Sequence, residues 1–305
     1  DIGTRVYTDL MAITAPHTTQ LNAETVAAND GHRYYFTTAP GNLVTITVHP
    51  TGGADAVIDT LLATETSKDN INNGGGGADE TFTFVQDATG YTPFRVTESG
   101  GAAMTYDLTV DVQPPYYSEH AGATAYADAC TGGTTVTLTA TGSFPGDDEG
   151  LSAPIATPTG FTFFGNATTQ FVLSSNGVLS FNTGLASALP GANVMPDGVG
   201  NANISAFWSD LQNVVICTKT VGTKLVIQWT GDEYNSGTGV AFQTILDPTD
   251  SSIEFVYGAG QAANGTTDPG SAGVQSTDGV QGTSTGDGSV AGFAAPNTAV
   301  KLTHP

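Results

Sequence analysis

Two strand-forming runs joined by a Ser-Asn-Gly corner make residues 171–181 the stretch that most constrains the fold. An Asn-Gly pair supplies the positive φ angles of a tight primed turn, so this stretch predicts a β-hairpin. Alternating apolar and polar runs recur roughly every 8 to 12 residues, and no run keeps a helical period. The length of 305 residues leaves room for about two domains. The sequence therefore predicts an all-β protein of two tandem β-sandwich (jelly-roll-like) domains.

Short apolar motifs follow one another along the second half of the chain. They are FTFFG at 161–165, SSNG at 174–177, AFWSDL at 206–211, LVIQW at 225–229, FQTIL at 242–246 and IEFVY at 253–257. Their order resembles the nidogen-like β module of secreted bacterial proteins, over about residues 126–303. This resemblance implies a location outside the cell and an accessory or structural role.

The first half carries LVTITV at 43–48, GYTPFRV at 90–96 and YDLTV at 106–110. These segments resemble the prepeptidase C-terminal domain, a jelly-roll β-sandwich found on secreted bacterial peptidases. That family usually carries a tryptophan where this chain has Gly31-His32-Arg33. No function of that tryptophan is therefore carried over to this chain.

The domain boundaries follow from these segments. We predict an N-terminal strand or arm at 1–18, a first sandwich at 19–113, a Pro/Tyr linker at 114–125 and a second sandwich at 126–305. The adjacent prolines 114 and 115 cannot donate to a β-ladder and favour extended chain. The arm is an extra edge strand of its own domain, the remnant of a linker, or a donor strand that completes the sheet of a neighbouring subunit.

The charge balance reflects a shortage of basic residues. The chain has 7 Lys and Arg against 29 Asp and Glu, which gives a net charge of −22. The basic residues are scattered, which excludes nucleic acid as a partner and disfavours anionic membranes. Divalent cations are the natural partners of such a surface. The chain starts at Asp1 and has no apolar run long enough to span a bilayer, as in a processed exoprotein.

Only two cysteines occur, Cys130 and Cys217. Neither belongs to a CxxC pair, so a zinc site is not expected. In a secreted chain they are expected to form one disulfide, and the alternative is two buried free thiols.

No pattern of catalytic residues stands out. The sequence contains no H-E-x-x-H motif, and neither cysteine is placed as a nucleophile with a plausible His partner. We therefore predict that the protein is not an enzyme. A hydrolase built on two acids that meet in space stays open as an alternative.

Calcium is the better-supported chemistry, because oxygen ligands in glycine-rich loops suit its flexible coordination. The candidate ligands are Asp55, Asp59, Asp69, Asn72 and Asp79 in the first domain, and Asp147, Asp148 and Glu149 in the second. None of these loops has EF-hand spacing, and the alternative is that they are solvated turn residues. Three tyrosines in predicted loops, Tyr116, Tyr117 and Tyr234, are the candidates for stacking on a sugar.

We therefore expect a non-catalytic protein that is secreted and located at the cell surface. It would be a structural subunit that self-associates into a fibre or matrix through its N-terminal strand. The alternative is an accessory module that binds a glycan or a surface protein and is released from a larger adhesin or peptidase.

Overall fold

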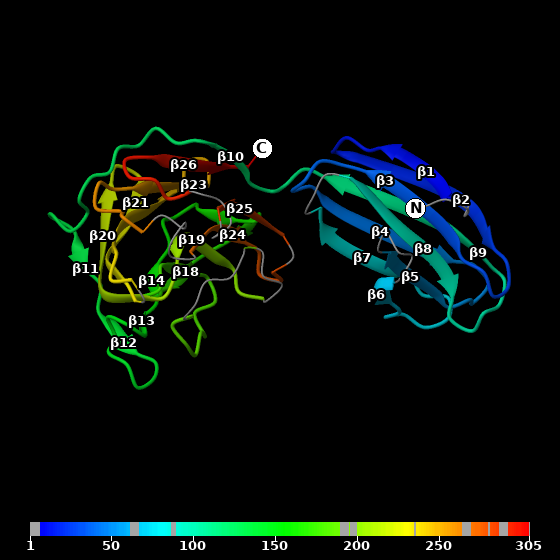
Figure 1. Ribbon diagram of the computed structural model, residues 1–305, viewed down its shortest axis with the longest axis horizontal. Helices are drawn as coiled ribbons and strands as arrows, with labels where there is room; N and C mark the ends of the chain where they lie inside the picture. Colours follow the sequence, from blue (N-terminus) through cyan, green and yellow to red (C-terminus); the bar gives the residue numbers. More distant parts are fainter. Residues whose placement is uncertain are drawn as a thin grey trace. The chain divides into compact units, whose positions relative to one another are not determined.

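The computed structural model describes residues 7–61, 67–86, 90–189, 195, 200–234, 236–263, 270–279, 281–286 and 292–304 (Figure 1). These residues form β-strands and connecting loops and contain no α-helix, so the all-β prediction is confirmed. No helix with the length and apolarity of a membrane span occurs in this part of the chain. Two compact units divide the chain, Asp1–Pro115 and Tyr116–Pro305.

The first unit is a sandwich of two sheets. Its strands are β1 (Tyr7–Ala12), β2 (His17–Val26), β3 (His32–Thr37), β4 (Leu43–Pro50), β5 (Ala56–Leu61), β6 (Ser67–Ile71), β7 (Glu80–Val85), β8 (Tyr91–Glu98) and β9 (Met104–Gln113). One sheet has the order β1-β3-β8-β5-β6, and the other has the order β2-β9-β4-β7. In β4 the side chains of Val44, Ile46 and Val48 are fully buried, as their alternation with threonine predicts.

The predicted N-terminal arm is part of this sandwich as far as the structure describes it. β1 pairs in parallel with β3, and β2 pairs with β9 from His17 onward. Leu10 and Ile13 are buried in the core of the unit. Residues 1–6 of the predicted arm lie outside the described residues. From residue 7 the segment is thus an edge strand of its own domain, one of the alternatives that the sequence left open.

The second unit has more strands, several of them only two or three residues long. They are β10 (Ser118–Ala121), β11 (Thr134–Thr135), β12 (Leu138–Ala140), β13 (Gly150–Ser152), β14 (Ile155–Ala156), β15 (Thr162–Phe163), β16 (Asn166–Ala167), β17 (Gln170–Leu173), β18 (Val178–Ser180), β19 (Asn203–Trp208), β20 (Leu211–Val221), β21 (Lys224–Glu233), β22 (Gly239–Asp247), β23 (Ser252–Tyr257), β24 (Ser271–Gln275), β25 (Gly282–Gly286) and β26 (Ala299–Thr303). A seven-stranded sheet has the order β10-β26-β23-β22-β21-β20-β11, and a six-stranded sheet has the order β14-β17-β18-β19-β24-β25.

The two large sheets enclose an aromatic core. The large side chains buried in this core include Trp229, Phe207, Phe242 and Tyr257, whereas Trp208 is buried in a separate small cluster. The indole of Trp229 on β21 donates to the carbonyl of Ser174, 2.9 Å away at the corner after β17. That bond joins the two sheets through the core.

The predicted hairpin at 171–181 is confirmed, because β17 and β18 pair in antiparallel register. Gly177 adopts a φ of +81° at the corner, and a Cβ there would lie 2.0 Å from the carbonyl oxygen of Phe207. Both observations require glycine at this position.

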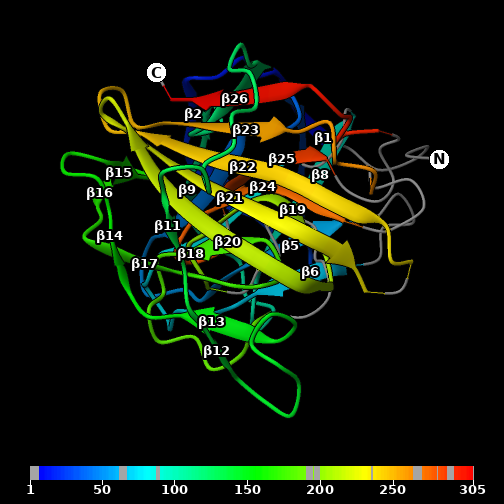
Figure 2. The ribbon, with the colours of Figure 1, turned by 90° about the vertical axis from the view of Figure 1, so that its left-hand side faces the viewer.

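A segment expected to be a linker belongs to the second unit. β10 lies within the predicted linker at 114–125 and pairs with the C-terminal strand β26. The segment then continues as residues 122–131, which we call the strap. Figure 2 shows the chain between β10 and β11 crossing the seven-stranded sheet on its viewer-facing side.

Buried polar side chains hold the strap on that sheet. Glu254 accepts hydrogen bonds from two strap amides at 2.9 Å each. Gln228 accepts one from the amide of Ala129, and Gln243 donates to the carbonyl of Ala127. The strap therefore covers the outer face of the sheet, which explains why residues on both faces of β22 and β23 are buried.

The two cysteines form the predicted disulfide. Cys130, at the end of the strap, is bonded to Cys217 on β20 across a sequence separation of 87. The bond fastens the strap to the sheet that it covers.

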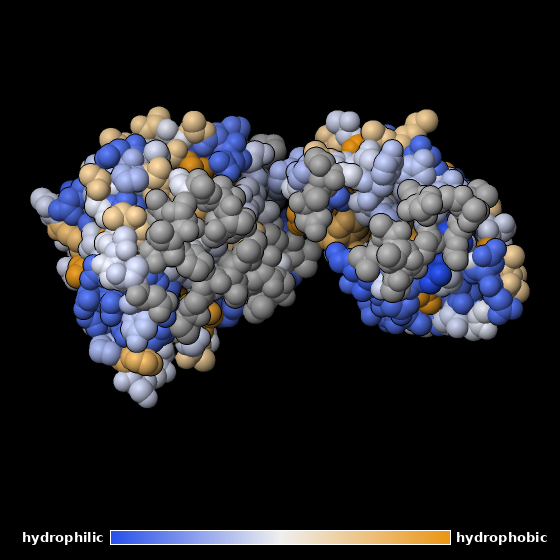
Figure 3. Space-filling model, viewed as in Figure 1, coloured by the Kyte–Doolittle hydropathy of each residue, from blue (hydrophilic) through white to orange (hydrophobic). Residues whose placement is uncertain are grey.

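On the face drawn in Figure 3, apolar residues lie scattered among hydrophilic ones in both units. No broad apolar patch stands out among the described residues of that face.

Candidate metal centre

Three acidic side chains converge in the second unit. Asp148 and Glu149 lie in the loop before β13, and Asp210 lies at the corner between β19 and β20. One carboxylate oxygen of each residue lies within 4.8 Å of those of the other two. We call these three residues the acid cluster.

A turn and a serine position the first two acids. The amides of Asp148 and Glu149 both donate to the carbonyl of Pro145, at 3.1 and 2.8 Å. The next amide, of Gly150, donates to Ser175 Oγ at 3.0 Å, and the amide of Ser175 donates back to the carbonyl of Gly150 at 2.9 Å. The acidic loop is thus fixed to the Ser-Asn-Gly corner of the hairpin.

Asn176, in that corner, ties three segments together. Its side chain is fully buried, and its Oδ1 accepts a hydrogen bond from the amide of Leu211 at 2.8 Å. Its Nδ2 donates to the carbonyl of Ala188 at 3.1 Å and, at a longer 3.5 Å, to the carboxylate of Glu149. One amide side chain therefore fixes both the acidic loop and the residue that follows Asp210.

The three carboxyl groups repel one another. Burial, and then the charge of Asp147, raises the pKa of Asp148. Burial raises the pKa of Glu149 as well, the hydrogen bond from Asn176 opposes that shift, and the charges of Asp210 and Asp148 add to it. Burial raises the pKa of Asp210 too, followed by the charges of Asp148 and Glu233. Binding of a cation or protonation of a carboxylate at the acid cluster is therefore expected to stabilise the folded protein.

Each lysine of the second unit binds a partner that is not a member of the acid cluster. Lys219 donates to the carbonyl of Thr131 at 2.7 Å. Lys224 pairs with Asp247 at 3.1 Å, and Lys301 pairs with Asp250 at 3.3 Å. These are all the lysines of residues 116–305, which contain no arginine.

The sequence predicted two of the three cluster members. Asp147, the third acid of the predicted loop, is exposed and outside the acid cluster, and its carbonyl accepts from the amide of Val214 at 2.9 Å. Asp210 was missed. Its signal was a lone acid two residues after the buried run Ala206-Phe207-Trp208, at a corner where a polar side chain can emerge from the core.

The calcium candidates of the first unit do not converge. No three His, Cys, Asp or Glu side chains among its described residues place ligand atoms within 4.8 Å of one another. Asp55 accepts from Ser99 at 2.6 Å, Asp69 accepts from Thr60 at 2.8 Å, and Asp79 pairs with His49. Asn72 is exposed in the loop after β6.

Asp59 is committed to a buried ion pair rather than to a metal. Its Oδ2 lies 2.7 Å from Nη2 of Arg95, and its Oδ1 accepts from Asn70 at 2.7 Å and from Ser67 at 3.1 Å. Burial by itself would raise the pKa of Asp59, but the bonds from Asn70 and Arg95 outweigh it and lower the pKa. Both oxygens are therefore occupied by donors of the protein.

The three candidate tyrosines differ in exposure. Tyr117 is fully buried, so its ring is not available for stacking on a sugar. Tyr116 packs its ring against Phe164 and His304. Tyr234 alone is an exposed large side chain, at 45%, and its amide donates to the carbonyl of Asp210 at 2.8 Å. The Pro-Pro-Tyr-Tyr sequence predicted an exposed loop. Tyr116 and Tyr117 instead lie directly before β10 and belong to the second unit.

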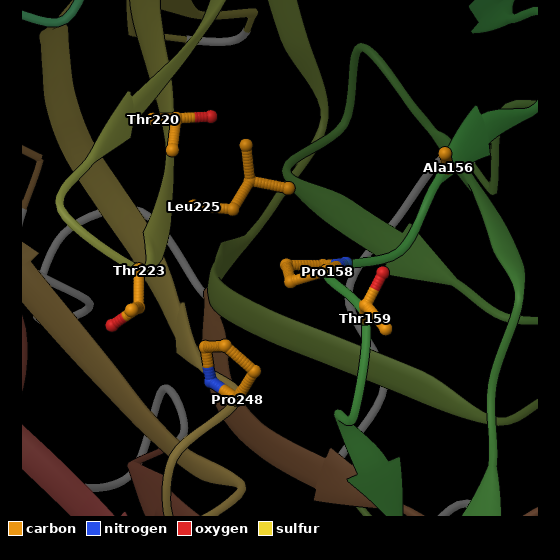
Figure 4. A pocket seen from close by; sticks show the side chains of 7 residues that line it. All are labelled: Ala156, Pro158, Thr159, Thr220, Thr223, Leu225 and Pro248. Carbon is orange, nitrogen blue, oxygen red and sulfur yellow. The ribbon is translucent and has the colours of Figure 1, made fainter.

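A separate hollow of about 300 Å³ lies in the second unit (Figure 4). It is lined by Ala156, Pro158, Thr159, Thr220, Thr223, Leu225 and Pro248. These side chains are apolar or hydroxylic and include no titratable group. The hollow therefore offers no acid, base or metal ligand from its side chains.

Comparison with known families supports one of the two resemblances directly. The model of a family described as NIDO related matches residues 116–302, more than half of the chain. No curated protein sequence matches the chain.

The similar solved structures share little sequence with this chain. The pre-peptidase C-terminal domain of a collagenase from Bacillus anthracis is 15% identical, with a TM-score of 0.27 over 36% of this chain and 100% of that domain. PliG from Aeromonas hydrophila, a periplasmic inhibitor of g-type lysozyme, is 18% identical, with a TM-score of 0.26 over 35% of this chain and 100% of PliG. The full extracellular region of zebrafish Gpr126/Adgrg6 is 7% identical, with a TM-score of 0.25 over 95% of this chain and 35% of that region. At these TM-scores the matches carry no functional assignment.

Proposed function

Because the chain belongs to the NIDO-related family through residues 116–302, we propose that it is a non-catalytic accessory module that works outside the cell. The disulfide between Cys130 and Cys217 supports that location, since such bonds persist in oxidising compartments. The observation that carries the proposal is the acid cluster. Three crowded carboxylates with no lysine or arginine beside them suit a structural cation better than an acid–base pair.

The cation that we propose is Ca²⁺. Asp148, Glu149 and Asp210 supply hard oxygen ligands from two loops, and each carboxylate can bind through one or both oxygens. Water would complete the coordination shell of six to eight oxygens. Ca²⁺ would offset the cost of burying the three carboxylates and the repulsion from neighbouring acids, which together raise their pKa values. It would also tie the acidic loop to the start of β20.

Calcium is expected to stabilise the second unit. Calcium sites of extracellular modules have Kd values of about 10⁻⁴ to 10⁻³ M, so 10 mM Ca²⁺ should add between about 1 and 3 kcal/mol to the free energy of unfolding. For a unit of this size, Tm should rise by roughly 3 to 10 °C. Calorimetry in EDTA and in CaCl₂ measures this, and Asp210→Asn should lose most of the rise. Asp79→Asn, which changes a carboxylate outside the acid cluster, should keep it. An equal rise in wild type and Asp210→Asn would refute the calcium site.

The metal-free protein should also respond to pH in a defined direction. The pKa values of the three acids are higher in the folded protein than their ordinary values of 3.8 for Asp and 4.5 for Glu. The protonated cluster therefore contributes its full stability to the fold below those ordinary values. That stability is lost as the pH rises through the higher pKa values of the folded protein. Asn at position 210 cannot ionise. In EDTA, the Tm of Asp210→Asn minus that of wild type should therefore grow as the pH rises from about 4 to 7. A constant or shrinking difference would contradict the electrostatic account.

Donor-strand assembly has weaker support than an accessory role. β1 pairs with β3 of its own sheet, and Leu10 on β1 is buried in its own core. Exchange with a neighbouring subunit would first have to remove that strand. Among the described residues β1 has a strand neighbour on one side, β3, so another chain could pair with β1 along its other edge.

A further inference from the structure

Three tyrosines form a band across the five-stranded sheet of the first unit. Tyr7 lies on β1, Tyr35 on β3 and Tyr91 on β8. The ring centroids of Tyr7 and Tyr35 are 6.0 Å apart, those of Tyr35 and Tyr91 are 5.1 Å apart, and both pairs meet edge to face. Tyr91 is 65% exposed, more than any other Phe, Tyr or Trp ring among the described residues.

The register places all three rings on the outer face of the sheet. Residues directly opposite each other on neighbouring strands point to the same side. The opposed pairs are Tyr7 with Arg33, Asp9 with Tyr35, Thr37 with Tyr91 and Arg33 with Arg95. The intervening residues Tyr34, Phe36 and Phe94 are fully buried in the core. The tyrosine band therefore faces away from the sandwich interior.

Hydrogen-bonding groups flank the band. The hydroxyl of Tyr35 is hydrogen-bonded to Asp9, which raises the pKa of the phenol. On the same face, Arg95 holds its guanidinium against Asp59 at 2.7 Å, and Asp59 lies opposite Asn70 of β6. The guanidinium of Arg95 is planar and offers hydrogen-bond donors in a fixed fork.

A polar hollow of about 450 Å³ adjoins the band, and Arg33 and Arg95 line it together with Asp30, Thr97 and Glu98. Gly31 leaves room for the side chain of Arg95, because a Cβ at Gly31 would lie 2.5 Å from Cδ of Arg95.

The charges of this face differ from those of the rest of the unit. Residues 1–115 hold 14 Asp and Glu against 4 Lys and Arg. Two of those four bases, Arg33 and Arg95, lie on this face. They lie beside Asp9 and Asp59, and Asp30 and Glu98 line the adjoining hollow, so the face carries no excess of positive charge. An uncharged partner rich in hydroxyl groups suits such a face, whereas a polyanion would be repelled by the rest of the unit.

We propose that the tyrosine face, formed by Tyr7, Tyr35 and Tyr91 with Asp9 and Arg95, binds a neutral polysaccharide chain. Sugar rings would stack their C–H faces on Tyr35 and Tyr91, and their hydroxyls would bond to Asp9 and to the guanidinium of Arg95. This inference rests on the proposed role as an extracellular accessory module and names the partner of that module.

The full chain is tested against cellulose, chitin and a soluble neutral mannan by pull-down and by affinity electrophoresis. Wild type is expected to bind at least one of them. The double variant Tyr35→Ala/Tyr91→Ala should bind at least about tenfold more weakly. Tyr35→Phe/Tyr91→Phe, which keeps the rings, should retain most of the binding. Phe144→Ala, which removes an exposed aromatic ring of the second unit, is the matched control and should bind as wild type does. The tyrosines lie outside the core, so the double variant should keep the wild-type Tm.

Several outcomes would overturn the inference. They are no binding to any of the three polysaccharides, equal binding by wild type and the double alanine variant, and binding of alginate or of immobilised protein with none of the neutral glycans. The calcium response of the second unit is measured on the same samples. If it persists while glycan binding fails, the tyrosine face is refuted and the accessory module stands. If it is absent, the calcium site fails whatever the glycans do.

Discussion

Replacing Asn176 with alanine is expected to lower the free energy of unfolding of the second unit by about 3 to 5 kcal/mol. The side chain is fully buried, and alanine would leave the amide of Leu211 without its acceptor. The carbonyl of Ala188 and the carboxylate of Glu149 would lose a donor. Each buried group left unpaired costs roughly 1 to 3 kcal/mol, and the cavity adds to that.

The same substitution should abolish the calcium response, because Asn176 fixes both segments that carry the acid cluster. Urea unfolding with and without CaCl₂ measures both effects. Asn182→Ala is the matched control, since Asn182 is an exposed residue close by in the chain whose amide bonds to Asn201. A loss below about 1 kcal/mol, or an intact calcium response, would show that Asn176 is not the link between the loops.

Removing the disulfide should have an effect of similar size. Replacing both Cys130 and Cys217 with alanine opens a loop of 87 residues, and the chain-entropy model gives a loss of about 4.5 kcal/mol. Reduction of the wild-type protein with dithiothreitol should produce a comparable fall in urea-unfolding stability. The variant itself should not respond to dithiothreitol. A variant as stable as the oxidised wild type would mean that Gln228, Gln243 and Glu254 suffice to hold the strap.

Local patterns were sufficient for the strands and for the hairpin. The Ser-Asn-Gly corner carries its own turn chemistry, and Val44, Ile46 and Val48 show the sandwich face through their spacing alone. Such features depend on neighbours within a few residues. These features could therefore be predicted from the sequence alone.

Features that depend on contacts between residues far apart in the sequence could not be predicted from it. Asp210 joins Asp148 and Glu149 only because the Ser-Asn-Gly corner meets the start of β20. Asp59 was predicted as a calcium ligand, but the register of β5 on β8 places it opposite Arg95. No local sequence pattern predicts the acid cluster or the ion pair between Asp59 and Arg95.

The region after Pro115 was misread for the same reason. Adjacent prolines are typical of a linker, yet the next residues pair with β26 at the far end of the chain. The tyrosine face depends likewise on how β1, β3 and β8 are ordered across a sheet.

The strap has a consequence for the order in which the second unit is assembled. It is synthesised before β20 to β23, the strands on which it lies, so it emerges with nothing to bind. The buried side chains that hold it belong to residues 228, 243 and 254, roughly a hundred positions further along the chain. Contacts across such separations form late, because the chain must first close a long loop. The strap can therefore pack only after β21, β22 and β23 have formed. Until it does, the outer faces of these strands stay uncovered.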